Sequence, residues 1–243
     1  MSTLSLARES DLNVRIVLLL ALLLPVLGLA DAARDAQSVH SPTLRLHQKA
    51  EELYSSGHFQ RAYFIYVNEL AAIGDKYAQY MAGYMSQYGK GVPEDVVRAS
   101  AWYRLAAEQG APQFVELRDQ VLESMSEEMR LESDAEYLAL RQKYSDLVLA
   151  IAQLREVRER VNDRSTGSHL AANSPAVTVI DPRTGVTISR SEYMRRIESR
   201  MQFLYDYITD KLDIEPVKPG LNDREFEALA AQVDAYLRVV DDR

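Results

Sequence analysis

From about residue 43 onward, apolar side chains recur every three or four positions, and polar side chains fill the positions between them. This spacing places the apolar residues on one face of an α-helix. The apolar stripes are short and are separated by glycine or proline, which end helices. The pattern therefore predicts an all-α protein in which short helices pair through tight turns.

The first predicted helix pair covers residues 43–56 and 59–73. Ser41 and Pro42 suit a helix start, as the capping residue and the first helical residue. Gly57 and Gly74 suit the two helix ends, because glycine readily adopts the left-handed conformation found there. The two helices are therefore expected to form one hairpin over residues 43–75.

A second and clearer pair lies within residues 76–110. The first helix, predicted over 77–88, carries small residues at Ala78, Ala82 and Gly83, which would let a neighbouring helix approach closely. The turn at 89–93 contains two glycines and a proline, so it cannot continue the helix. The second helix is predicted from Asp95 to residue 109, with Gly110 as its C-terminal cap.

This second pair resembles the Sel-one-like repeat (SLR), a relative of the tetratricopeptide repeat (TPR). Ala82 and Ser86 depart from the family pattern, where leucine and tyrosine are usual. Residues 43–75 resemble a more degenerate TPR unit, so residues 43–111 are read as two tandem repeats. The resemblance implies an α-solenoid that binds other proteins. The residues that carry the repeat signature are Ala78, Gly83, Gly89, Gly91, Asp95, Ala99, Trp102, Tyr103, Ala106, Ala107 and Gly110.

Residues 112–163 are predicted to form a helical hairpin that caps the two repeats. One helix is expected over 112–130, and a long amphipathic helix over 134–163 begins at a capping box formed by Ser133 and Glu136. Apolar residues from Tyr137 to Val161 form a seam at alternating spacings of three and four. An antiparallel partner within the same chain is favoured over a coiled-coil homodimer, because the flanking positions lack complementary charges.

The remaining residues are predicted to form a linker with a β-hairpin, 164–190, and a C-terminal helix pair, 191–243. Two β-branched runs, 177–180 and 186–188, flank a turn sequence that contains proline and glycine. Capping boxes are expected at Ser189 with Glu192 and at Asn222 with Glu225. The predicted fold is thus all-α: a short TPR/SLR-like α-solenoid extended by a long helical hairpin, with one small β-hairpin and a C-terminal helix pair.

The first 32 residues resemble a secretory signal peptide. The uninterrupted apolar run at 16–24 is shorter than the ~20 residues of a membrane-spanning helix. Ala30 and Ala32 are small residues at the positions that signal peptidase requires, so cleavage after Ala32 is expected. The mature chain would then be periplasmic or secreted, in a bacterial envelope. The alternative is an uncleaved N-terminal segment that serves as the one attachment to a membrane.

Composition excludes several classes of function. The net charge of −8 argues against nucleic-acid binding, which needs clustered basic residues. The chain has no cysteine, and its four histidines are not spaced as metal ligands, so neither a metal site nor a cofactor is expected. No pairing of a nucleophile with a base can be read from the sequence, and no catalytic residue is assigned.

Tyrosines on the helix predicted over 77–88 are the candidate binding residues. Tyr80, Tyr84 and Tyr88 are spaced by four and share a face with Gln87, away from the small residues. In TPR-like arrays the first helix of each unit lines the concave surface, and tyrosine offers a large contact area with a polar tip. The alternative is that these rings pack against a neighbouring helix as part of the core.

The sequence thus favours an exported, non-catalytic scaffold that binds a protein or peptide partner. One alternative is a structural protein that forms a homo-oligomer through the seam at 137–161. The other is an envelope enzyme that acts on cell-wall material.

Overall fold

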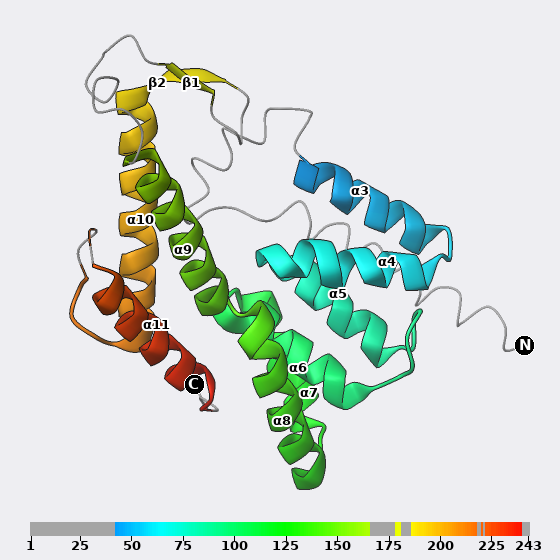
Figure 1. Ribbon diagram of the computed structural model, residues 1–243. Coiled ribbons are helices and arrows are strands. Elements are labelled where there is room, and N and C mark those ends of the chain that lie inside the picture. The colour runs from blue at the N-terminus through cyan, green and yellow to red at the C-terminus, as the bar shows by residue number, and fades with distance from the viewer. Residues whose placement is uncertain (1–41, 166–177, 181–185, 218–219, 221, 240–243) are drawn as a thin grey trace, which may run out of the picture. The chain divides into compact units, whose positions relative to one another are not determined.

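The computed structural model describes residues 42–165, 178–180, 186–217, 220 and 222–239 (Figure 1). The described residues from Thr43 onward belong to one compact unit. The predicted signal peptide and its cleavage site lie outside the described residues. Within those residues, the helices are too short or too polar to cross a membrane.

The first helix pair consists of α3 (Pro42–Ser55) and α4 (Phe59–Ile65). The second helix was predicted to continue regularly to residue 73. Instead α4 passes into a π-helical turn, η1 (Tyr66–Leu70), and a 3-10 turn, η2 (Ala71–Ile73). Gly74 ends the segment with a left-handed backbone, φ 87°, as the sequence predicted.

The second pair consists of α5 (Lys76–Gln87) and α6 (Val96–Ala106), followed by the 3-10 turn η3 (Ala107–Gln109). Asp75 and Asp95 cap the two helices, since each carboxylate accepts a hydrogen bond from a backbone N–H of the first turn. Gly110 has a φ of 73° and forms the left-handed C-terminal cap. Both helices of the SLR-like pair therefore lie where the pattern placed them.

The helix predicted over 112–130 is in fact two helices, α7 (Pro112–Glu123) and α8 (Glu127–Tyr144). Ser126 caps α8 by accepting a hydrogen bond from Met129 N. The predicted cap at Ser133 is wrong, because Ser133 lies inside α8, fully buried, with its Oγ 2.6 Å from Ser100 Oγ of α6. Helices α7 and α8 both pack on α6.

The predicted long helix over 134–163 is also wrong, because it breaks at Ser145. The backbone of Ser145 is extended, ψ 152°, and its Oγ accepts a hydrogen bond from Val148 N in the first turn of α9 (Asp146–Ser165). The break divides the predicted seam between two cores. Tyr137, Leu140 and Tyr144 join the core of the repeats, whereas Leu147, Ile151 and Leu154 join a second core.

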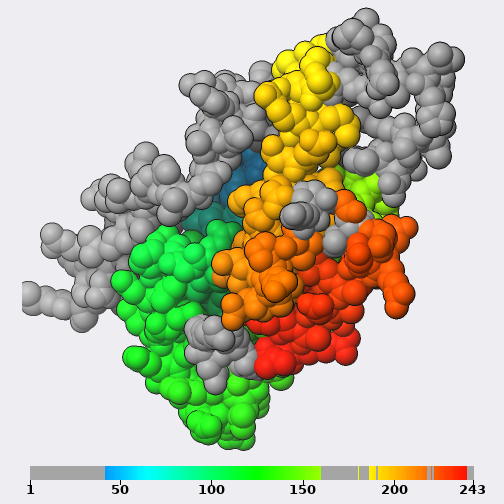
Figure 2. Space-filling view, turned by 90° about the vertical axis from the view of Figure 1, so that its left-hand side faces the viewer, coloured from blue at the N-terminus to red at the C-terminus, as the bar shows by residue number. Residues whose placement is uncertain are grey.

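Helices α10 (Arg190–Leu212) and α11 (Asp223–Leu237) build that second core with α9. In Figure 1 α9 runs beside α10, and α11 packs against α8, α9 and α10. The space-filling view shows the orange and red surface of α10 and α11 adjoining the green surface around residues 100–140 (Figure 2). The seam residues from Tyr137 to Leu154 are thus buried by helices of their own chain, as the favoured interpretation expected.

Two short strands precede α10. Strands β1 (Thr178–Ile180) and β2 (Thr187–Ser189) pair antiparallel, with Val179 opposite Ile188, while the turn predicted between them lies outside the described residues. The capping box at Asn222 and Glu225 is confirmed. At Ser189 one half of the predicted box forms, because Glu192 instead pairs with Arg195 and Arg196.

Candidate functional site

Helix α5 presents two different faces. Its small-residue face, with Ala78, Ala82 and Gly83, is fully buried, and the ring of Tyr103 from α6 packs directly on Gly83. The opposite face carries Tyr77, Tyr80 and Tyr84, which are half-buried and lie against the core of the repeats. Tyr88 follows the last residue of the helix, and 53% of it is exposed.

The tyrosine rings along α5 form a continuous ladder. The ring centroids of Tyr77 and Tyr80 are 6.0 Å apart, those of Tyr80 and Tyr84 are 6.3 Å apart, and those of Tyr84 and Tyr88 are 4.7 Å apart. All three contacts are tilted, with interplanar angles of 31–49°, in the distance range of favourable aromatic pairs. The ladder therefore holds the rings in a defined arrangement.

Rings from the neighbouring pairs extend this ladder across the repeats. Tyr54 of α3 lies 6.5 Å from Tyr84, and Phe114 of α7 lies 5.8 Å from Tyr80, measured between ring centroids. Helices α3, α5 and α7 thus contribute to one aromatic surface. We call this surface the aromatic face, and it consists of Tyr54, Tyr77, Tyr80, Tyr84, Tyr88 and Phe114.

Gln87, which the sequence grouped with these tyrosines as a candidate binding residue, also contacts Tyr103 of α6. Its side-chain oxygen accepts a hydrogen bond of 2.7 Å from the hydroxyl of Tyr103, whose ring lies 6.0 Å from that of Tyr80. The side-chain oxygen of Gln87 therefore helps to hold the ring of Tyr103 next to that of Tyr80.

Burial keeps the hydroxyls of Tyr66, Tyr77 and Tyr80 protonated. Glu51 of α3 accepts hydrogen bonds from Tyr66 at 2.7 Å and from Tyr77 at 2.8 Å. Burial raises the pKa of both hydroxyls well above its usual range, and the charge of Glu51 acts in the same direction. Burial likewise raises the pKa of Tyr80 to about 12. At neutral pH these three hydroxyls are therefore uncharged and can donate hydrogen bonds.

Two ionisable groups flank the aromatic face, and the sequence pattern had assigned a role to neither. His47 Nε2 lies 2.8 Å from Asp75 Oδ2, and this hydrogen bond, more than any other cause, raises the pKa of His47. At the other end, Lys90 Nζ lies 5.3 Å from the ring centroid of Phe59. Both contacts join residues far apart in the sequence, so periodicity gave no signal for them.

The repeat signature residues hold the scaffold together. Ala78, Ala99, Trp102, Ala106 and Ala107 are buried, and the ring of Trp102 lies 4.9 Å from that of Tyr144 in α8. The turn residues of the signature, Gly89, Gly91, Asp95 and Gly110, lie at the helix ends. None of these residues belongs to the aromatic face.

A buried charge cluster links the repeats to the C-terminal half. Lys76 Nζ of α5 lies 3.3 Å from Glu108 Oε2 and 3.0 Å from Asp146 Oδ1 of α9, and these side chains are 10–15% exposed. Burial raises the pKa of Glu108, opposed by the nearby charge of Lys76. Sequence reasoning missed this cluster because its members come from three separate elements. Within the described residues, no group of histidines and carboxylates is arranged to hold a metal ion.

Comparison with known proteins gives one family match. Residues 76–110 match the model of the Sel1 repeat, the family that the sequence pattern resembles. The chain therefore carries a Sel1 repeat within an all-α, TPR-like helical array, which indicates a protein-interaction scaffold. No curated protein and no solved structure matches this chain.

Proposed function

We propose that this protein is an exported, non-catalytic scaffold that binds an extended segment of a partner protein on the aromatic face. The observation that carries the proposal is the meeting of aromatic rings from α3, α5 and α7 on one surface. The Sel1 repeat supports a protein rather than a small molecule as the ligand.

The geometry of the ladder suits an extended peptide. Successive ring pairs from Tyr77 to Tyr84 are spaced by 6.0 and 6.3 Å. In an extended strand, side chains on the same side recur about every 6.6–6.8 Å, so alternate side chains of a bound segment could each contact one ring. Because the rings are already held by their neighbours, binding would cost little side-chain entropy.

The location in the bacterial envelope is part of the proposal and rests on the sequence. The apolar residues 16–29 precede Ala30 and Ala32, which suit cleavage by signal peptidase. N-terminal sequencing of the natively expressed protein tests it. A mature chain that begins at Ala33 or within three residues of it supports export, and an intact Met1 in a soluble cytoplasmic fraction contradicts it.

Site-specific photo-crosslinking in cells tests the aromatic face directly. A photoreactive phenylalanine analogue replaces Tyr88, and in a matched control it replaces Phe203, which lies on α10 and is 64% exposed. We expect a discrete adduct from position 88 that is absent from position 203. Identical adducts at both positions, or none at position 88, would contradict binding at this face.

A further inference from the structure

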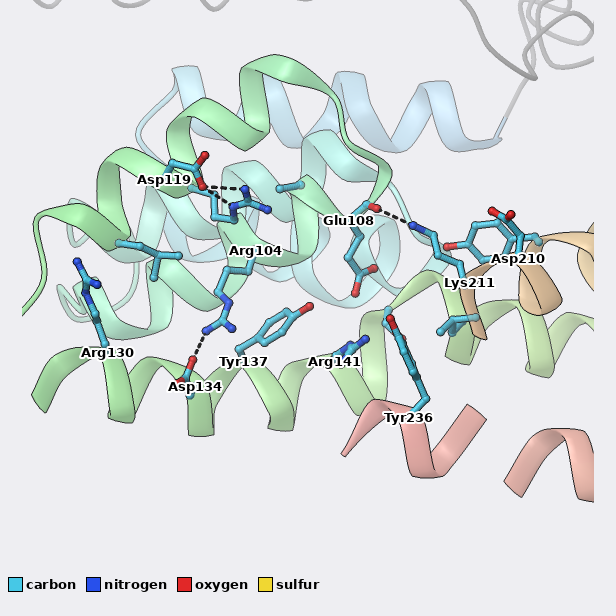
Figure 3. Close-up of a pocket in the computed structure, with 16 residues that line it drawn as sticks. Arg104, Glu108, Asp119, Arg130, Asp134, Tyr137, Arg141, Asp210, Lys211 and Tyr236 are labelled. Carbon is cyan, nitrogen blue, oxygen red and sulfur yellow. Dashed lines mark hydrogen bonds and ion pairs between the residues drawn. The ribbon is translucent and has the colours of Figure 1, made fainter. Parts of the chain in front are cut away.

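A cavity separate from the aromatic face lies between the repeats and the C-terminal helices (Figure 3). Its volume is about 560 Å³, within the range of about 300–1,000 Å³ typical of ligand sites. Helices α6, α7, α8, α10 and α11 all contribute to its walls. The cavity is accessible to solvent at its rim, where Arg130, Asp210 and Lys211 are exposed.

Most of the acidic side chains that line the cavity already have basic partners. Asp134 lies 2.6 Å from Nη1 of Arg104, and Asp119 lies 2.7 Å from Nη2 of Arg118. Glu108 is held by Lys76 from outside the cavity. Three basic side chains of the cavity, Arg130, Arg141 and Lys211, take no part in these ion pairs.

Arg141 is the central observation. It is 5% exposed, and no carboxylate within the described residues lies at ion-pair distance from it. Its Nη1 donates a hydrogen bond of 2.8 Å to the backbone oxygen of Val239, and its Nε has no acceptor within the described part of the chain. A buried charge without a counter-charge is costly, and so is a buried donor without an acceptor.

Aromatic rings hold the guanidinium group of Arg141 in place. Its central carbon lies 4.8 Å from the ring centroid of Tyr236 and 5.7 Å from that of Tyr137. Figure 3 shows Arg141 between these two rings, with Lys211 nearby and Arg130 at the far side of the cavity. Burial raises the pKa of Tyr137 to about 12, so its hydroxyl remains a neutral donor. The guanidinium group of Arg141 is therefore preorganised to donate hydrogen bonds.

We propose that this cavity binds an oxyanion, a carboxylate or a phosphate group, with Arg141 as the buried anchor. The planar guanidinium fork matches the oxygens of either group and can donate two parallel hydrogen bonds. Arg130 and Lys211 at the rim attract the anion. Because the cavity is larger than a single oxyanion, the group is expected to be carried on a larger molecule, and the site is independent of the aromatic face.

The test is an NMR titration of the purified full chain that follows the Nε–H signal of Arg141. The probes are inorganic phosphate, and acetyl-trialanine with either a free or an amidated C-terminus, each compared with chloride at equal ionic strength. A saturable shift with phosphate identifies a phosphate source. A saturable shift with the free peptide and none with its amide identifies a peptide carboxylate. If neither probe shifts the signal more than chloride does, the proposal is overturned.

Variants at the rim give a second measurement that does not depend on removing the buried anchor. Loss of both rim charges in Arg130→Gln with Lys211→Gln is expected to weaken binding about tenfold, because each charge attracts the anion. The matched control is Arg98→Gln with Lys49→Gln, which removes the same charge from residues outside the cavity. Equal weakening by the control pair would show screening of the overall charge rather than a site.

Discussion

The ring of Tyr103 in α6 lies directly against Gly83 in α5, so closely that a Cβ on Gly83 would stand 2.6 Å from Tyr103 Cε1. Helices α5 and α6 can therefore cross at this point only if residue 83 has no side chain. Tyr103 is in turn held by Gln87 and supports Tyr80 of the aromatic face. The packing of the repeat and the position of the candidate site thus depend on the same contact.

The first prediction concerns this contact. Gly83→Ala is expected to destabilise the protein by about 1–3 kcal/mol, because the added methyl group overpacks the helix crossing. In an exposed helix the same change would stabilise by about 0.5–1 kcal/mol, so the sign of the effect is informative. Urea unfolding monitored by circular dichroism measures it. A rise in the free energy of unfolding would contradict the close approach.

The second prediction concerns Trp102, which is fully buried against Tyr144. Trp102→Ala is expected to cost about 3–5 kcal/mol, since it leaves a large cavity in the core of the repeats. Thermal melts compare this variant with the wild-type chain. A melting temperature within a degree of the wild-type value would mean that Trp102 does not join α6 to α8.

The third prediction separates the two interpretations of the tyrosines. Tyr88→Ala is expected to change stability by less than about 0.5 kcal/mol, because Tyr88 is exposed. It should nevertheless weaken partner binding by about tenfold or more if Tyr88 is an interface hot spot.

Tyr80→Ala serves as the comparison in the same measurements. It should lower the melting temperature, because Tyr80 contacts Tyr103 and Phe114. If Tyr88→Ala destabilises the chain as strongly as Tyr80→Ala, the whole ladder is core, and the binding proposal loses its basis.

The fourth prediction concerns pH. The hydrogen bond to Asp75 raises the pKa of His47 above the usual histidine value of about 6.5. Protonated His47 therefore stabilises the fold fully below pH 6.5, and this contribution is lost as the pH rises through the raised pKa. His47→Gln should flatten this part of a plot of unfolding free energy against pH. A variant with an unchanged pH profile would show that the pair does not contribute.

The fifth prediction concerns the buried charge cluster. Lys76→Met leaves Glu108 and Asp146 buried without their cation, and is expected to cost about 3–5 kcal/mol. Lys49→Met is the matched control, since Lys49 is exposed and pairs with Glu52 within one helix turn. Denaturant unfolding of the two variants should therefore show a severalfold larger loss of unfolding free energy for Lys76→Met than for Lys49→Met. Equal losses would contradict a structural role for the cluster.

The sequence pattern predicted the helices of the repeats closely because their boundaries have local causes. Gly74, Asp75, Asp95 and Gly110 each act within one turn of their own helix. The capping box at Asn222 and Glu225 was found for the same reason. At these helices the adjacent cap was sufficient to place the boundary from the sequence.

The sequence pattern failed to predict helix boundaries where the apolar spacing continues through a break between two helices. Apolar residues on both sides of Ser145 keep the same phase, so a single long helix was predicted, although the two halves belong to different cores. Ser133 had the spacing of a cap, but tertiary packing buried it against Ser100. The contacts of the aromatic face between helices depend on tertiary structure, which a periodic pattern does not contain. The same holds for the Nε donor of Arg141, which lacks an acceptor among the described residues.

The extended backbone at Ser145 also sets a limit on the length of the helical array. A repeat array can in principle accept another unit at either end. Here the surface beyond α6 is occupied by α8, whose last residues contact Trp102 and accept a hydrogen bond from Gln79, while α9 departs to pack with α10 and α11. A further repeat inserted after α6 would have to displace α8 from this surface. Lengthening of the array, whether in natural variants or by engineering, is therefore expected only on the α3 side.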